Sequence, residues 1–200
     1  LREKLFEIIR ELNLRHMCSS DVQYPFTVTK EFITKDIFSD RPKITPNMIS
    51  DSPRIGLVNG LYATAAGLGG ITVIETFEIP SDNKFSLELT GQQGDVMKES
   101  MKVARTVAWN IIPVSIKKKL YKQCEKEGNF GIHIHCPEGG TPKDGPSAGG
   151  AITLAIISLL TKIPIKNTIG ITGEIDLNGS IRAIGGLESK VDGAKKAGVK

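Results

Sequence analysis

The sequence reads Pro137-Glu138-Gly139-Gly140-Thr141-Pro142-Lys143-Asp144-Gly145-Pro146-Ser147-Ala148-Gly149 where a loop rich in glycine and proline runs directly into an apolar segment. The apolar run from Ser147 to about Leu160 predicts a buried helix that begins at the serine. The N-terminus of a helix presents unpaired backbone N–H groups, and its dipole favours negative charge. A serine at that point is well placed to attack a carbonyl carbon, because the oxyanion formed would meet these amides.

Three other interpretations of this loop compete with a nucleophilic serine. Gly140 and Gly145 have the spacing of a phosphate-binding loop, but Pro146-Ser147 stands where that motif requires a lysine followed by serine or threonine. The string Gly-Pro-Ser-Ala-Gly fits the nucleophile elbow of α/β-hydrolases, whose histidine must follow the serine. All of the histidines precede it here, so this interpretation fails too (His16, His133 and His135). A plain helix cap at Ser147 stays open on local grounds.

A nucleophilic serine needs a base, and lysine is the alternative to histidine. His133 and His135 are two apart on a predicted strand, so they face the same side, and structural hydrogen bonding is the favoured interpretation for them. A lysine can act as a base where burial lowers its pKa. Lys190 shares a predicted helix side with Leu187 and Ala194, which makes it a candidate. Periodicity alone does not settle this choice.

The remainder of the chain alternates between helical and strand-like patterns. Helices are predicted at residues 1–15, 30–38 (capped by Thr29), 95–108, 115–127, 147–160 and 186–197. Strands are predicted at residues 55–61, 71–77, 85–89, 131–136, 168–172 and 180–184. Because strands and helices do not alternate as regular βαβ units, we expect an α+β fold, an irregular mixed α/β arrangement with short, mostly mixed sheets and flanking helices.

A proline-rich stretch divides the chain near residue 40. Residues 39–54 hold Pro42, Pro46 and Pro53 among Ser, Asp and Asn, which is the composition of a linker. We therefore expect a helical segment at residues 1–40, a linker at 41–54 and a second domain at 55–200.

Composition excludes several classes of function. The chain has 200 residues, 40% of them hydrophobic, and a net charge of +4, which is ordinary for a globular protein. The basic run Lys117–Lys119 is interpreted as a solvated helix face, and the few aromatic residues weaken any case for nucleic-acid binding. Three widely spaced cysteines without a CxxC pair predict neither a disulfide framework nor a zinc site, and favour a reducing compartment. The longest apolar stretch is too short to span a membrane.

Several ordered motifs resemble the Lon protease family. The run at residues 142–149, Pro-Lys-Asp-Gly-Pro-Ser-Ala-Gly, is similar to that family's nucleophile signature, and residues 133–139 are similar to its His-x-His-x-Pro-Glu-Gly lead-in. Further matches are Thr172-Gly173-Glu174-Ile175, Gly185-Gly186-Leu187-Glu188-Ser189-Lys190 and the Thr-Gly stretch at residues 89–100. The resemblance covers roughly residues 44–200, and the separation of 43 residues between Ser147 and Lys190 agrees with the family.

The resemblance implies roles for five side chains. Ser147 would be the nucleophile and Lys190 the general base, while Thr172 would orient the lysine. Asp144 lies where the family has an acidic residue that can engage the lysine in inactive arrangements, and Glu75 matches an acidic residue near the active site. Backbone amides at the junction of loop and helix would form the oxyanion hole.

The resemblance also implies a setting for the chain. It implies an ATP-dependent serine endopeptidase that degrades unfolded or damaged proteins as a homohexamer, in the cytoplasm or the mitochondrial matrix. Residues 1–40 would be the end of the helical subdomain of an AAA+ ATPase, and the chain would stop before the last elements of the proteolytic domain. ATP and magnesium belong to the full-length family; no Walker A motif is present, so we expect no cofactor in this chain. The alternative is an inactive oligomerisation or substrate-holding module of the same fold, and the changed Gly60-Leu61-Tyr62-Ala63-Thr64 string motivates it.

Overall fold

A computed structural model describes residues 2–19, 22–41, 47–137 and 142–200. The chain divides into two compact units, residues 1–45 and 46–200. Most of the predicted linker's prolines and residues 138–141 of the predicted loop lie outside the described residues. The two units are described separately below.

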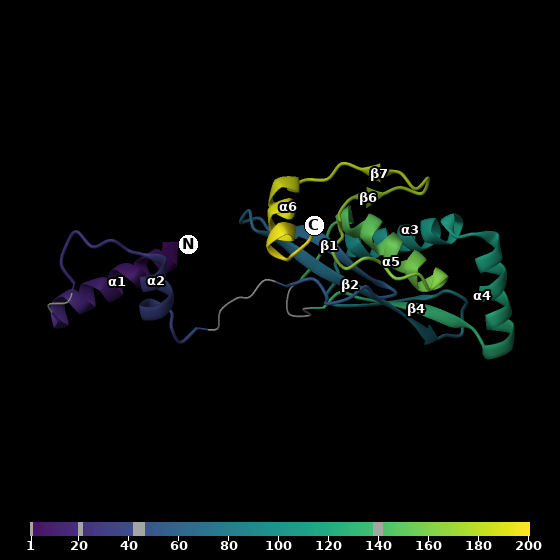
Figure 1. Ribbon diagram of the computed structural model, residues 1–200, viewed down its shortest axis with the longest axis horizontal. Helices are drawn as coiled ribbons and strands as arrows, with labels where there is room; N and C mark the ends of the chain where they lie inside the picture. The colour runs from purple at the N-terminus through teal and green to yellow at the C-terminus, as the bar shows by residue number, and fades with distance from the viewer. Residues whose placement is uncertain (1, 20–21, 42–46, 138–141) are drawn as a thin grey trace. The chain divides into compact units, whose positions relative to one another are not determined.

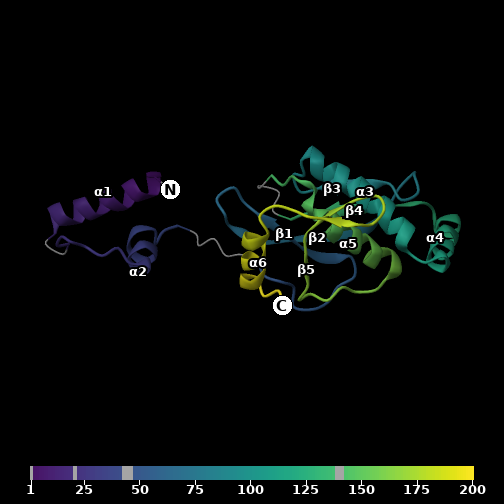
Figure 2. The same cartoon turned by 90° about the horizontal axis from the view of Figure 1, so that it is seen from above.

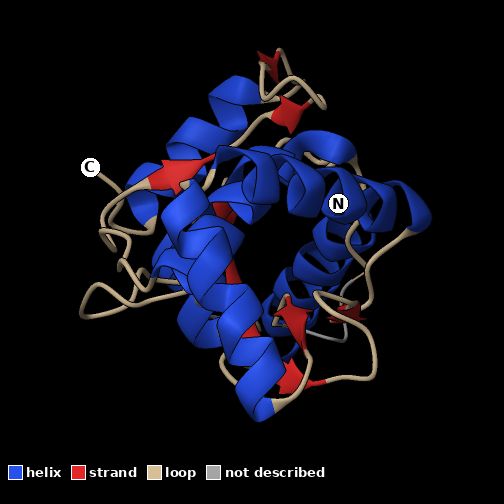
Figure 3. Ribbon diagram, turned by 90° about the vertical axis from the view of Figure 1, so that its right-hand side faces the viewer, coloured by secondary structure: helices blue, strands red, loops and turns tan. Residues whose placement is uncertain are grey.

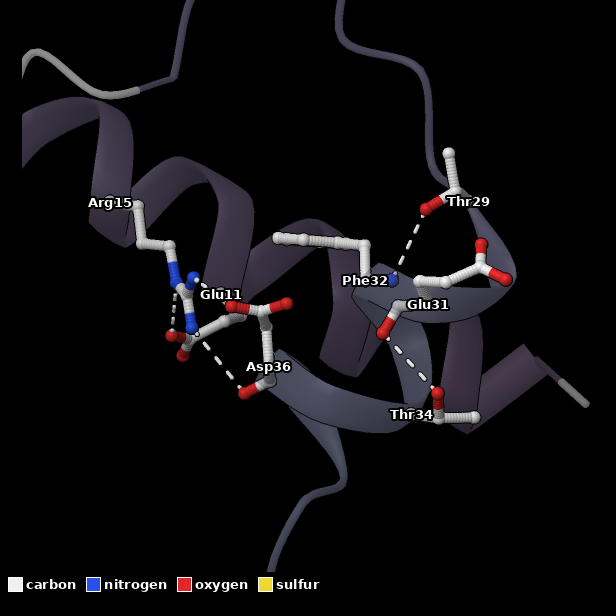
Figure 4. Close-up of polar contacts among 7 residues, drawn as sticks. All are labelled: Glu11, Arg15, Thr29, Glu31, Phe32, Thr34 and Asp36. Carbon is white, nitrogen blue, oxygen red and sulfur yellow. Dashed lines mark hydrogen bonds and ion pairs between the residues drawn. The ribbon is translucent and has the colours of Figure 1, made fainter.

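The first unit is a small helical cluster. Helix α1 (Arg2–Cys18) is followed by α2 (Lys30–Phe32), which continues as a π-helix, η1 (Ile33–Ile37). Ile8 and Leu12 of α1 are buried together with Val22. Figure 4 shows polar contacts of this unit, in which Arg15 of α1 bonds Glu11 on the same helix and Asp36 on η1. The predicted cap is confirmed, because the N–H of Phe32 donates to Oγ1 of Thr29 at 3.2 Å.

The second unit is built on a mixed five-stranded sheet. Its strands are β1 (Leu57–Ala63), β2 (Gly69–Pro80), β3 (Leu87–Thr90), β4 (Phe130–His135) and β5 (Gly170–Ile171), in the order β3-β4-β2-β1-β5. The central strand β2 is antiparallel to both β1 and β4, whereas β3 runs parallel to β4 and β5 parallel to β1. A separate hairpin pairs β6 (Glu174–Ile175) with β7 (Ile181–Arg182).

Helices cover the large sheet. They are α3 (Asp95–Ile111), α4 (Val114–Glu127), α5 (Gly149–Thr161) and α6 (Leu187–Lys196), with a 3₁₀ turn, η2 (Pro146–Ala148), directly before α5. Helix α5 is apolar all round because it packs on β1 and β2 with one side and on α3 with the other. Figures 1 and 2 show α3 and α5 side by side over the sheet, and α6 at one end of β1 and β2. The β6–β7 hairpin lies on the outer side of the helices (Figures 1 and 3).

The structure confirms the mixed α/β architecture and corrects several element boundaries. The predicted helix at Ser147 begins as a 3₁₀ turn, and the α-helix starts two residues later at Gly149. The strands predicted at 168–172 and 180–184 each shrink to two residues. At the first of these, Nδ2 of Asn59 donates to the carbonyls of Asn167 and Ile169, at 2.8 and 2.9 Å. The Asn59 side chain thus occupies backbone carbonyls that would bond to a neighbouring strand if β5 were longer. No helix among the described residues is both long and apolar enough to cross a membrane.

Candidate active site

Ser147 lies in the 3₁₀ turn η2, between the glycine- and proline-rich loop and the buried helix α5. Its backbone carbonyl accepts a hydrogen bond from the N–H of Gly173 at 2.7 Å and from Oγ1 of Thr172 at 3.3 Å. Gly173 has φ +155°, and a Cβ there would lie 2.4 Å from Cγ2 of Ile181. A glycine is therefore required where the strand segment after β5 passes the serine.

The loop before Ser147 is attached to the start of α3. Oδ1 of Asp144 accepts from the N–H of Met97 at 2.9 Å and from the N–H of Gly145 at 2.9 Å. The N–H of Gly94 donates to the carbonyl of Lys143 at 2.7 Å, and a Cβ on Gly94 would lie 2.3 Å from Cγ of Asp144. Asp144 therefore caps α3 from a distant part of the chain, and these contacts run to α3 and its own loop instead of to Lys190.

Replacing Asp144 with alanine should lower the free energy of unfolding by roughly 0.5–2 kcal/mol, the usual cost of losing a helix cap. The effect follows because the N–H of Met97 would lose its carboxylate acceptor. Asp144→Asn should lose less than Asp144→Ala, since an amide oxygen can accept the same bond. Urea unfolding measures the difference. Asp95→Ala is the comparison, since its side chain is 98% exposed at the same helix end; an equal loss there would contradict the capping role of Asp144.

Lys190 reaches Ser147 from α6. Its Nζ lies 3.0 Å from Oγ of Ser147 and 3.2 Å from Oγ1 of Thr172, and the residue is only 5% exposed. The structure thus brings together three of the predicted side chains: Ser147 in η2, Thr172 directly after β5 and Lys190 on α6. Nζ of Lys190 lies within hydrogen-bond distance of both hydroxyls.

Burial governs the charge state of this lysine. Desolvation lowers the pKa of Lys190 below its ordinary value of 10.5, because the charged ammonium loses contact with water. Within the part of the chain that the structure describes, no carboxylate forms an ion pair with Lys190 to oppose this effect. The hydroxyls of Ser147 and Thr172 are its polar neighbours. Burial therefore shifts the equilibrium of Lys190 toward the neutral amine, which is the form that can accept a proton.

Glycines place α6 against the sheet. A Cβ on Gly193 would lie 2.1 Å from the carbonyl carbon of Gly69, and a Cβ on Gly69 would lie 1.8 Å from the carbonyl oxygen of Ser189. Backbone atoms of α6 and of β2 are therefore in direct contact, which side chains at either position would prevent. Lys190 lies on the helix that makes this close approach.

Glu75 is not brought to the serine or the lysine by a hydrogen bond or ion pair among the described residues. It lies half-buried on β2, paired in register with Leu57 and His135. Burial raises the pKa of the Cys136 thiol to about 11, and the charge of Glu75 adds a smaller contribution in the same direction. Any role of Glu75 in catalysis stays a prediction from the family resemblance.

The two strand histidines have a structural role. Oγ1 of Thr90 lies 2.8 Å from Nε2 of His133 and 2.6 Å from Nδ1 of His135, so one hydroxyl joins both rings. They face the same side, as their spacing predicted. Both are engaged with β3 and neither contacts Ser147.

Sequence reasoning missed two groups that fix the site. Ser100 is buried on α3, and its Oγ donates to the carbonyl of Pro146 at 3.3 Å, directly before Ser147. A serine within the apolar face formed by Met97, Met101 and Ala104 was the available signal. Gly193 is the second missed group. Nothing in its local sequence indicates that it contacts another strand. Across the described residues, no group of three or more His, Cys, Asp or Glu side chains is arranged to hold a metal ion.

Comparison with known proteins assigns the family. The Lon protease (S16) C-terminal proteolytic domain matches residues 27–200. A Lon protease homolog of Acanthamoeba polyphaga mimivirus is 42% identical over 185 residues, which cover 90% of this chain and 17% of that protein. Lon protease 2 of Thermus thermophilus is 41% identical over 160 residues, 80% of this chain and 19% of the relative.

A Lon protease of Flavobacterium johnsoniae is 38% identical over 200 residues, which cover all of this chain and 23% of the relative. The chain thus spans about a fifth of the length of these three relatives. Because the family match takes in nearly the whole chain, this protein belongs to the Lon protease (S16) family, and residues 27–200 are its C-terminal proteolytic domain.

Proposed function

We propose that this chain cleaves peptide bonds by nucleophilic catalysis, with Ser147 as the nucleophile and Lys190 as its general base. One observation carries the proposal: Nζ of a lysine that is 5% exposed lies 3.0 Å from Oγ of Ser147. That distance is within the range for direct proton transfer. Burial without an ion-pair partner among the described residues lets the amine keep its lone pair at a lower pH than an exposed lysine would.

The first half of the reaction forms an ester on the serine. Oγ of Ser147 attacks the carbonyl carbon of the scissile peptide while its proton passes to the neutral Nζ of Lys190. The tetrahedral intermediate then collapses, the carbon–nitrogen bond breaks, and the ammonium of Lys190 returns the proton to the leaving amine. The products of this half are an acyl-enzyme, a free amine and a neutral lysine.

The second half hydrolyses the ester. Water attacks the acyl carbon as Lys190 takes its proton, and the ester oxygen leaves as Ser147 Oγ, which regains a proton from the lysine. The released peptide is a carboxylic acid. Both halves need the same amine in the same place, so one lysine serves as base and then as acid in each.

The negative oxygen of each intermediate needs hydrogen-bond donors. Pro146 has no N–H, and the i→i+3 bonds of the 3₁₀ turn η2 begin with the N–H of Ala148, so the N–H of Ser147 precedes that pattern. We assign the Ser147 amide to the oxyanion hole. A donor of this kind typically contributes about 3–4 kcal/mol to the stability of the transition state.

Thr172 is proposed to orient the lysine. Its Oγ1 donates to the backbone carbonyl of Ser147 and accepts from Nζ of Lys190, so the hydroxyl connects the two halves of the site. Since the hydroxyl proton is directed to the carbonyl, the lone pairs of Oγ1 face the amine. This arrangement restricts the rotamers of Lys190 to those that face Ser147.

The rate of peptide cleavage should fall as the pH is lowered through the pKa of Lys190. The sign follows because protonation removes the lone pair that accepts the proton of Ser147, and desolvation places that protonation below the ordinary lysine value. Steady-state hydrolysis of a short fluorogenic peptide between acid and alkaline pH measures this profile. A rate that is flat across the whole range, in a purified and folded chain, would contradict the role of Lys190; retention of peptide without turnover would instead favour the inactive substrate-holding module.

The wider setting of the chain is also part of the proposal. We infer that the intact protein is intracellular and works as a homohexamer. We also infer that ATP and magnesium act in an AAA+ module to which residues 1–40 contribute. The proposed substrates are unfolded or damaged proteins. The relationship to proteins named Lon protease supports this setting. Native mass spectrometry of the intact protein tests it, since a species other than a six-subunit ring would overturn the hexamer.

A further inference from the structure

A cavity lies away from the serine and lysine, near the other end of α5. Its volume is about 290 Å³, and Leu160, close to the last residue of α5, lies in its wall. The same wall includes Phe85, Trp109 and Tyr121. Ser147, by contrast, lies before the first turn of α5, so none of the proposed catalytic side chains lines this cavity.

Three aromatic rings contribute to the wall. The ring centroids of Phe85 and Trp109 are 4.5 Å apart, those of Trp109 and Tyr121 are 5.6 Å apart, and Tyr121 is 43% exposed. Phe85 has a left-handed φ of +57°, and Nη1 of Arg105 donates to its carbonyl at 3.2 Å. A bulky residue is held in that conformation only by its surroundings, so the aromatic wall is fixed in place before any ligand arrives.

The rim of this cavity is basic. Nζ of Lys84 lies 5.3 Å from the centroid of Tyr121, and Nζ of Lys117 lies 5.7 Å from the centroid of Trp109. Arg105 contributes a third positive charge to the wall. None of the described residues that line the cavity is Asp or Glu. Aromatic cavities often bind cations, but here the positions over the rings already hold ammonium groups, which repel a second cation.

We propose that this cavity binds a bulky apolar side chain flanked by carboxylates, presented by an acidic segment of a protein substrate. An apolar cavity of about 150 Å³ accommodates benzene, so 290 Å³ is enough for one aromatic side chain and its adjoining backbone. Lys84 and Lys117 would pair with carboxylates on either side of that residue. The ligand's role as substrate rests on the proposed peptidase function; the binding event does not.

Trp109 provides a direct measure of binding, because it is the chain's single tryptophan. A blocked aspartyl-phenylalanyl-aspartate tripeptide would be titrated into the Ser147→Ala protein while Trp109 emission is followed. We expect a saturable change in emission. Lys84→Glu should weaken binding by about tenfold, because a salt-sensitive attraction becomes a repulsion of similar size. Lys118→Glu, an exposed change on α4 outside the cavity wall, is the matched control and should leave the affinity unaltered.

Two further ligands test the chemistry of the cavity. A lysyl-phenylalanyl-lysine tripeptide should not bind, because its charges match those of the rim. Absence of any saturable change at millimolar acidic peptide, or equal binding of the basic peptide, would overturn the proposal. So would tighter binding of a short single-stranded oligonucleotide, because base stacking on Trp109 would then explain the basic aromatic surface better.

A kinetic comparison separates this proposal from the proposed catalytic function. In the active protein, Lys84→Glu should raise KM for a long substrate that carries an acidic aromatic segment and leave hydrolysis of a short fluorogenic peptide unchanged. If the short peptide is not cleaved even by the unaltered chain, the catalytic proposal fails while the tryptophan titration still decides the binding. An unchanged KM for the long substrate would overturn the cavity's role in substrate capture.

Discussion

Lys190→Met should reduce peptide cleavage by about 10²- to 10⁴-fold, the range in which a positioned general base contributes. Methionine fills much of the same volume, but it has no amine to take the proton of Ser147 across the 3.0 Å contact. The expected loss is in kcat, since the lysine acts on the reacting hydroxyl. Single-turnover and steady-state hydrolysis of a fluorogenic peptide measure it. Ser147→Ala should lose more, roughly 10⁴-fold or beyond, because the nucleophile itself is absent.

The control for this prediction is folding. The pKa of Lys190 is lower in the folded chain than its ordinary value of 10.5, so between these two values the unfolded chain binds the extra proton. The free energy of unfolding therefore rises with pH in that window, and Lys190→Met should remove this rise while the variant stays folded. Lys195→Met, an exposed change on the same helix, should leave both cleavage and the pH dependence of stability intact. Undiminished cleavage by purified Lys190→Met would refute the assignment of the base.

Gly193→Ala should both destabilise the second unit and lower its activity. Helix propensity alone favours alanine over glycine by about 1 kcal/mol, so the naive expectation is a gain in stability. Here the new Cβ would lie 2.1 Å from the carbonyl carbon of Gly69, a contact that only movement of backbone can relieve. Overpacking of this kind typically costs about 1–3 kcal/mol, which exceeds the gain in propensity.

The effect on catalysis should exceed the effect on folding. To relieve the clash, α6 must move away from β2, and Lys190 lies on that helix with its Nζ at hydrogen-bond distance from two hydroxyls. An offset of about 1 Å in a catalytic group can lower a rate by roughly 10²-fold. The comparison is urea unfolding together with kcat, measured at a temperature where the variant is fully folded.

Gly185→Ala is the matched change for this experiment. Gly185 lies just before α6, and a Cβ there would meet no atom within 4 Å. We expect stability and kcat within the error of the unaltered chain. If Gly193→Ala proved more stable than the parent and as active, the glycine contact would not be what positions the lysine.

The place of Ser147 at the start of a helix was predictable from the sequence because its signals are local. A rigid loop followed by a long apolar run predicts a helix start at Ser147, and the structure differs only in making the first turn a 3₁₀ helix. The position of Lys190 beside Ser147 was not predictable in this way. Lys190 differs from Lys195 and Lys196 only by burial, and that burial is produced by backbone contact with β2, a strand far away in the sequence.

The supporting groups illustrate the same limit. Asp144 lies in a loop and caps a helix about fifty residues earlier in the chain. No local sequence pattern indicates which helix its carboxylate will cap. The short β5 strand was overestimated because the side chain of Asn59 takes carbonyls that a ladder would bind. Apolar periodicity predicted α3 well, since that helix buries one continuous face, and the predicted strand at residues 71–77 lies within β2. Contacts made by single polar atoms leave no such periodic trace.

The contact between Gly69 and α6 also orders events during synthesis of the chain. The ribosome releases β2 and Ser147 before it releases α6, since Lys190 lies nearest the C-terminus of the three. Contacts between segments so distant in sequence form slowly, because loop closure must precede them. A nascent chain therefore carries Ser147 for some time without Lys190 beside it. On the proposed mechanism, cleavage must await the step that docks α6, and the emerging polypeptide is spared from its own serine until then.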